Sequence, residues 1–155
     1  MPPPRFHCPA PLAANTRIDL PAALAHHALR VLRLRPGTAI TLFNGTGGEY
    51  AAVLHADGAQ AWAETEGFNP IERELPGRIT LLQGLASGDK MDWIIEKAVE
   101  MGIARLAPIT AQRSVLQLSG PRLDKRMQHW RRIAQSAGEQ CGRNQIMHID
   151  VPAPL

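Results

Sequence analysis

The chain has 155 residues, of which 45% are hydrophobic and 20% are charged, a composition typical of a soluble globular protein with one domain or two small ones. Seventeen basic residues against fourteen acidic ones give a net charge of +3, the pI is near 9.3, and fourteen of the bases are arginine. Two distant cysteines argue against a disulfide framework and a zinc site, and no apolar run approaches the roughly 18 residues of a membrane span.

We therefore expect a cytoplasmic protein with reduced thiols, no metal and no membrane contact, since the segment from Met1 to His7 also lacks the apolar core of a signal peptide. Arginine favours bidentate contacts to phosphate over loose attraction, although a GC-rich genome would give the same bias. Composition alone thus leaves a polyanionic partner open.

Residues 1–72 alternate short apolar segments with turn signals, which predicts a small β-rich domain. Its strand candidates are residues 38–43, 50–54 and 59–63. The turn signals are Pro36-Gly37, Asn44-Gly45, Gly47-Gly48 and Asp57-Gly58. The glycine-rich stretch at residues 44–48 lacks the lysine of a phosphate-binding loop and precedes a strand, so we interpret it as a hairpin turn.

One helix interrupts these strands. Asp19 can cap it, Pro21 suits its first turn, and it is expected to stop at Pro36-Gly37. His26, Arg30 and Arg33 project from one side of this helix, and His27 lies one residue-step away. Two arginines one turn apart on an exposed face repel each other unless an anion joins them. This cluster suits phosphate and sugar contacts.

The segment at residues 69–77 is polar and contains prolines, which predicts a linker, and a β–α–β–α–β order follows it. Strands are predicted at residues 78–85, 106–109 and 146–151. A first helix is capped by Asp89 and ends at Gly102, and a second starts near Pro121. This alternation predicts a mostly parallel sheet in a second domain at residues 73–155.

The second helix of this domain has two distinct sides. An apolar seam is expected to pack inward, with Cys141 as a core thiol; it comprises Leu123, Met127, Trp130, Ala134, Ala137 and Cys141. A basic stripe occupies a separate arc; it comprises Arg122, Lys125, Arg126, His129 and Arg132. The stripe can track a phosphate backbone, and a plain solvated helix face is the alternative.

Three further residues are candidates for a site in the second domain. Arg113 follows a predicted strand, and ligands of open α/β sheets gather beyond the carboxyl ends of strands. Glu139 and Arg143 are four residues apart at the end of the second helix, where they can pair or face a bound nucleotide. On the first helix, an acidic row of Asp92, Glu96 and Glu100 is better explained by a solvated face or a subunit contact than by catalysis.

Together these segments resemble the RsmE-type ribosomal RNA methyltransferases. The resemblance rests on five segments in the order found in that family: Arg5-Phe6, residues 27–33, residues 88–102, Gln112-Arg113 and residues 139–144. It implies an α+β two-domain fold, with an N-terminal PUA-like β-barrel followed by an α/β SPOUT domain. The implied activity is methyl transfer from S-adenosylmethionine to N3 of a uridine in 16S ribosomal RNA, by a homodimer.

The resemblance also implies roles for individual residues. It implies RNA contacts for Arg5, His27, Arg30 and Arg33, and we add Arg122 and Arg126 from the basic stripe. It implies positions near the catalytic cleft for Arg113, Glu139 and Arg143. The family usually has an acidic residue where this chain has Gln112, which puts in doubt any role of that carboxylate in orienting Arg113.

Length is the largest departure from the family, whose members continue with a glycine-rich cofactor loop and a trefoil knot. We therefore expect the knot to be absent here and the S-adenosylmethionine site to lie beyond residue 155. The chain alone is then predicted to be inactive and to expose apolar surface on its incomplete second domain. The alternatives are a non-enzymatic RNA-binding protein and an α/β protein for a small anionic ligand.

Overall fold

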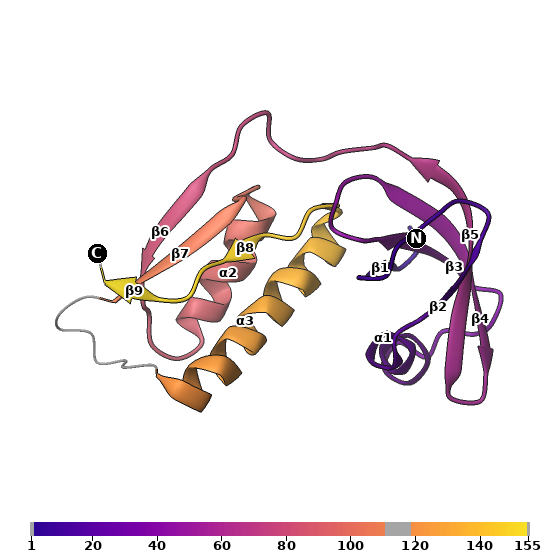
Figure 1. The fold of residues 1–155 in the computed structure, drawn as a ribbon, viewed down its shortest axis with the longest axis horizontal. Coiled ribbons are helices and arrows are strands. Elements are labelled where there is room, and N and C mark those ends of the chain that lie inside the picture. Colours follow the sequence, from indigo (N-terminus) through magenta and orange to yellow (C-terminus); the bar gives the residue numbers. More distant parts are fainter. Residues whose placement is uncertain (1, 111–118, 155) are drawn as a thin grey trace. The chain divides into compact units, whose positions relative to one another are not determined.

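The computed structural model describes residues 2–110 and 119–154. The chain divides into two compact units, Met1–Arg73 and Glu74–Leu155, and Figure 1 shows the helices and strands of each. The two are described separately below. None of the helices in the described ranges is long and apolar enough to cross a membrane.

The first unit is built on a five-stranded sheet with the order β1-β3-β4-β5-β2. Its strands are β1 (Arg5–His7), β2 (Arg17–Asp19), β3 (Ala39–Phe43), β4 (Glu49–Asp57) and β5 (Gln60–Asn69). β1 pairs with β3 in parallel and the other pairs are antiparallel. The three predicted strands are confirmed, and β4 and β5 extend beyond the predicted bounds because they form one long hairpin around Gly58.

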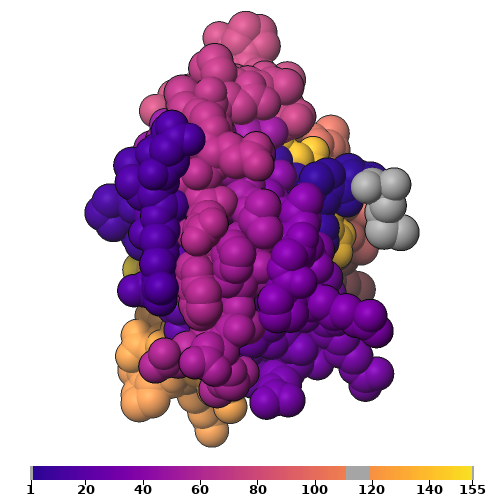
Figure 2. All heavy atoms as spheres, turned by 90° about the vertical axis from the view of Figure 1, so that its right-hand side faces the viewer, coloured from indigo at the N-terminus to yellow at the C-terminus, as the bar shows by residue number. Residues whose placement is uncertain are grey.

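The core of this unit lies under the sheet, where apolar side chains from the strands meet those of a short helix. Phe6, Ile40, Leu42 and Leu54 are almost fully buried there, together with Ala28 of the helical segment. Figure 2 shows the outer surface of the unit, where β4 and β5 (purple to magenta) lie beside the N-terminal segment that contains β2 (indigo).

The helix of the first unit is shorter than predicted and changes character midway. It runs as α1 (Ala22–His26) and continues as a π-helical turn, η1 (His27–Val31). The predicted cap is wrong: Pro21 occupies the cap position, and Asp19 belongs to β2, where its carboxylate accepts a hydrogen bond from Arg17 Nε at 3.0 Å. Sequence periodicity assumes 3.6 residues per turn and cannot anticipate a wider turn.

The predicted stop at Pro36-Gly37 is also wrong, because the helical segment already ends at Val31. The Leu32 N–H donates to the His27 carbonyl and the Leu34 N–H donates to the Ala28 carbonyl, each at 2.9 Å. These bonds close the helix end and force Arg33 into the left-handed region, with a φ of +53°.

The second unit is a parallel sheet with two helices. Its elements are β6 (Thr80–Gly84), α2 (Lys90–Glu100), β7 (Arg105–Thr110), α3 (Gly120–Cys141), β8 (His148–Ile149) and β9 (Ala153–Pro154). β7 pairs with β6 on one side, and on the other with β8 near its start and β9 near its end. The strand predicted at residues 146–151 is thus shortened to β8, and β9, beyond Pro152, was not predicted.

Both helices pack into one core with the sheet. Ile95 of α2, Trp130 of α3 and Leu106 of β7 are buried in the same apolar cluster, with Leu81 of β6 at its margin. The two crossover connections step across the sheet in the same direction, and right-handed crossovers then place both helices on one face. The adjacent residue Leu82 points to the other face and is 63% exposed, in line with the apolar exposure expected from the sequence.

The apolar seam of α3 is confirmed except at its last position. Met127, Trp130, Ala134 and Ala137 are buried, whereas Cys141 is exposed. Gly142 ends the helix with a φ of +86°, and Cys141 in the last turn is exposed although Gly138 in the same turn is buried. A helical projection gives the direction in which a side chain points, but it does not show whether another element covers that position.

The two thiols should therefore react very differently with a thiol reagent. Cys8 is fully buried, and this burial raises the pKa of its thiol, whereas Cys141 is exposed. Since the thiolate is the reactive form, we expect one rapidly labelled thiol per native chain, and we expect labelling of Cys8 to need unfolding or a higher pH. Absorbance-monitored labelling of the C8S and C141S variants checks this, and rapid labelling of C141S at neutral pH would contradict it.

Candidate nucleic-acid interface

The basic stripe predicted on α3 forms an exposed surface hollow. Its four arginine and lysine side chains, His129 and Gln128 line an open depression of about 700 Å³ along one face of the helix. These residues are Arg122, Lys125, Arg126, Gln128, His129 and Arg132. The buried seam on the other side of α3 packs into the core of the second unit. The charged side chains therefore project from a helix whose position is fixed by that core.

His129 is the member of the stripe that has a carboxylate partner. Its Nε2 lies 2.7 Å from Oδ2 of Asp92 on α2. The other two carboxylates of the acidic row belong to Glu96 and Glu100, and both contact Lys97. They raise the pKa of Lys97, and Glu100 has the larger effect. The acidic row is thus explained by ion pairs on the surface of the unit.

The other four cations of the stripe have no ion-pair or hydrogen-bond partner among residues 2–110 and 119–154. Like charges held close together on one helix face repel each other, so a surface of this kind gains free energy when an anion binds. This observation favours a polyanionic ligand over a plain solvated face.

A second exposed cluster lies at the end of the helical segment of the first unit. His27, Arg30 and Arg33 are all exposed, and neither arginine has a carboxylate partner in the part of the chain that the structure describes. The His27 ring meets the Phe6 ring edge-on, with 6.1 Å between centroids. Phe6 thereby fixes the position of the first member of the cluster from within the core.

Arg33 holds its place at an energetic cost, because its positive φ is unfavourable for a side chain with a Cβ atom. Glycine is the residue normally found at such a helix end. A cation at this position therefore does not serve the stability of the fold, and strained residues of this kind cluster at functional sites.

Arg5, a further predicted RNA-binding residue, is held inside the first unit. Its side chain is 14% exposed, forms an ion pair with Glu49, and lies 5.0 Å from the centre of the Phe43 ring. Arg73 approaches the same carboxylate at 3.3 Å. Arg5 thus contributes to the packing of the first unit, and its contact with RNA stays a prediction.

Arg143, predicted near the catalytic cleft, is buried and saturated with partners. Its Nε and Nη2 donate to the carboxylate of Glu74, with a shortest distance of 2.6 Å, and Nη1 donates to the carbonyls of Val99 and Ile103 at 3.0 and 2.9 Å. Val99 lies in the last turn of α2, where its carbonyl also accepts a hydrogen bond from the Gly102 N–H, and Ile103 follows just after the helix. Arg143 therefore holds the end of α2 and tethers Glu74, a residue that the sequence did not single out.

The two remaining catalytic candidates are less defined. Glu139 is half-buried on α3 and accepts a hydrogen bond from Gln135 at 3.1 Å. Arg113, with the neighbouring Gln112, lies outside the described residues. No group of three or more His, Cys, Asp or Glu residues suited to a metal ion occurs within the described ranges.

Comparison with known proteins defines the class of the chain. The model of the RNA methyltransferase domain matches residues 73–155, and the model of the RNA methyltransferase PUA domain matches residues 20–62. The curated Ribosomal RNA small subunit methyltransferase E of Bacillus subtilis is 32% identical over 126 residues, which cover 80% of this chain and 49% of that protein. The corresponding protein of Buchnera aphidicola from Acyrthosiphon pisum is 28% identical over 96% of this chain and 59% of its own length.

Solved structures agree with this class. Ribosomal RNA small subunit methyltransferase E from Neisseria gonorrhoeae, solved with bound S-adenosyl methionine, is 37% identical with a TM-score of 0.92, over 98% of this chain and 63% of that one. A Legionella pneumophila protein solved with bound cofactor SAM has a TM-score of 0.94 at 28% identity, over 99% of this chain and 64% of that one. This chain thus spans about half to two thirds of the length of these relatives.

The chain thus combines a domain of the RNA methyltransferase class with a preceding RNA methyltransferase PUA domain. More particularly, the chain belongs to the family of the Ribosomal RNA small subunit methyltransferase E proteins, as the resemblance in its sequence predicted.

Removing the buried guanidinium should strongly destabilise the second unit. In R143A, Glu74 keeps a largely buried charge without its partner, and the end of α2 loses two hydrogen bonds. We expect the free energy of unfolding to fall by about 3–5 kcal/mol, measured by urea denaturation. The control is R105A, which removes an exposed pair with Asp150 and should cost at most about 1 kcal/mol. Equal losses in the two variants would contradict this role.

Relieving the strain at Arg33 should stabilise the first unit. We expect R33G to raise its free energy of unfolding by about 0.5–1 kcal/mol, because glycine adopts a positive φ without steric cost. Asn15 has the same φ of +53°, but asparagine tolerates it, so N15G should change little. Thermal denaturation of both variants measures the difference, and a destabilised R33G would show that the Arg33 side chain supports the fold.

Proposed function

We propose that this chain supplies the RNA-binding half of an enzyme that methylates N3 of a uridine in 16S ribosomal RNA, with S-adenosylmethionine as the methyl donor. The observation that carries this proposal is a set of arginines on both units that have no ion-pair or hydrogen-bond partner among the described residues, in a chain of the RNA methyltransferase family. They include Arg30, Arg33 and Arg122, which are exposed, and Arg126, which is partly exposed.

In this proposal the first unit acts as a PUA-like barrel and the second as the opening part of a SPOUT domain without its knot. The exposed cations bind phosphates of the RNA, release counterions, and so hold the target region in register. His27 adds a ring nitrogen for phosphate or sugar. The ribosomal partner also implies a cytoplasmic location.

S-adenosylmethionine supplies an electrophilic methyl group when it is bound. Ligands of open α/β sheets bind at the carboxyl ends of the strands. In this chain residues 111–118, which follow β7, lie outside the described residues. The chain spans about half to two thirds of the length of its relatives, and we propose that these 155 residues alone do not transfer a methyl group.

The three residues predicted near the cleft divide by their surroundings. We propose Arg113 and Glu139 as contacts of the target uridine, where a cation can stabilise charge that develops on the uracil oxygens. We propose Arg143 as a positioning residue, since its guanidinium is occupied by Glu74 and the end of α2.

We also propose that the complete enzyme is a homodimer. The exposed Trp93 and Met101 on α2, which are 62% and 73% exposed, supply apolar area of the kind that subunit contacts cover. A non-enzymatic RNA-binding protein is the second candidate, because arginines without a carboxylate partner among the described residues would bind RNA without any catalytic step.

The stripe on α3 should dominate the salt dependence of RNA binding. We expect the logarithm of the affinity for a 16S ribosomal RNA hairpin to fall linearly with the logarithm of the salt concentration, and R122A/R126A to reduce that slope by roughly 1.5–2. The control is R131A, which removes an exposed arginine that does not line the basic hollow of α3. Fluorescence anisotropy at several salt concentrations measures the slopes. A reduction in R131A of half that size, as expected for one charge instead of two, would show that net charge alone, and not this surface, binds the RNA.

A further inference from the structure

A pocket in the first unit lies apart from both cation clusters. It is formed where the strand β2 and the start of α1 meet the first residues of β5, and it has a volume of about 290 Å³. This size is at the lower end of small-molecule sites and suits a single planar ring system. Its floor is apolar and buried, with Leu20, Ala25 and Ala61 at 8%, 2% and 5% exposure.

One wall of the pocket is a stack of planar groups across three strands. The Trp62 ring is parallel to the His55 ring, with centroids 5.5 Å apart and an interplanar angle of 7°. On the β2 side, the Arg17 guanidinium lies 4.2 Å from the centre of the Trp62 ring. Arg17 Nε also donates to Asp19, so the stack fixes the carboxylate at the pocket.

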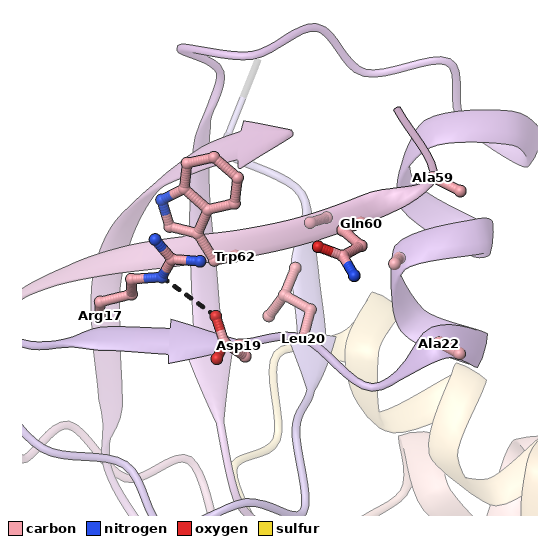
Figure 3. A pocket seen from close by; sticks show the side chains of 9 residues that line it. Arg17, Asp19, Leu20, Ala22, Ala59, Gln60 and Trp62 are labelled. Atoms are coloured by element: carbon pink, nitrogen blue, oxygen red, sulfur yellow. Dashed lines mark hydrogen bonds and ion pairs between the residues drawn. The ribbon is translucent and has the colours of Figure 1, made fainter. Parts of the chain in front are cut away.

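Two polar side chains face the pocket and have unused hydrogen-bonding capacity. Figure 3 shows the Asp19 carboxylate and the Gln60 amide on either side of the Leu20 side chain. Asp19 is 79% exposed and its described partner is Arg17. The Gln60 amide makes no hydrogen bond to any residue that the structure describes. The pocket thus offers an acceptor pair on one side and an amide on the other.

We propose that this pocket binds one unpaired guanine of single-stranded RNA. Guanine is the base whose Watson–Crick edge presents two adjacent N–H donors, at N1 and N2, which match the two oxygens of a carboxylate. Its opposite edge carries the acceptors O6 and N7, which match the donors of the Gln60 amide. The guanine ring packs on the apolar floor of the pocket. Arg17, on the pocket wall, contacts the phosphate next to the guanine.

The other bases fit this arrangement less well. Adenine and cytosine place a ring-nitrogen acceptor beside their amino group, and that acceptor is repelled by the Asp19 carboxylate. Uracil presents its N3–H between two carbonyl oxygens, which are repelled in the same way. The carboxylate therefore selects against three bases as well as for one.

This inference rests on the proposed function, since it gives the RNA-binding half a base-specific contact. It is tested by titrating the isotope-labelled chain with the pentanucleotides UUGUU, UUAUU and UUUUU, and following the indole N–H signals by NMR, with W62F to assign Trp62. We expect UUGUU to bind at least about tenfold more tightly than the other two and to shift the Trp62 signal. D19N and Q60A should remove most of this preference, whereas D57N, a charge change on β4 outside the pocket, should retain it.

The outcomes separate the subsite from the proposed function. Equal affinities for the three RNAs, with a salt dependence that R122A/R126A reduces, would overturn the guanine subsite and leave RNA binding intact. A guanine preference that survives in D19N would overturn it as well. No affinity for any of these RNAs or for the ribosomal hairpin would overturn both.

Discussion

The guanidinium of Arg143 joins three parts of the second unit that are distant in sequence. It neutralises Glu74, where the unit begins; it holds the end of α2; and it does so from the turn that follows α3. A buried charge is tolerated only when its hydrogen bonds are satisfied, and here each nitrogen of the guanidinium has a partner. The relative positions of α2 and α3, and with them the face that carries the basic stripe, depend on this one side chain.

The arginines of the chain fall into two groups with different physical tasks. Arg5 and Arg143 are largely buried and paired with carboxylates, so they stabilise the units that contain them. Arg30, Arg33, Arg122 and Arg126 are more exposed and have no carboxylate partner in the described residues. Arg33 even adopts a strained backbone conformation. These cations are not neutralised by carboxylates within the described residues, so phosphate groups of RNA can pair with them. This property links the electrostatics of the chain to its proposed function.

Local patterns in the sequence predicted much of this structure. Periodicity was sufficient for α3, because its buried seam and basic stripe both follow from the 100° rotation per residue, and the turn residues predicted the hairpins of the first unit. Wrong predictions came from features that depend on neighbours in space. Cys141 is exposed although its place in the helical projection is on the buried side, and the helix of the first unit ends early because of a π-helical turn. Glu74 lies 69 residues from Arg143, and the pocket beside Trp62 combines residues 17–25 with residues 59–62, so no local pattern could reveal either.

We propose that this chain recognises ribosomal RNA but does not bind the methyl donor by itself. Isothermal titration calorimetry with S-adenosylmethionine, and separately with a short 16S ribosomal RNA hairpin, measures both properties in one experiment. We expect a heat of binding for the RNA that weakens as salt is raised, and no heat for S-adenosylmethionine at concentrations that saturate a complete methyltransferase. Stoichiometric binding of S-adenosylmethionine to the 155-residue chain, or an RNA affinity that is absent or insensitive to salt, would contradict it.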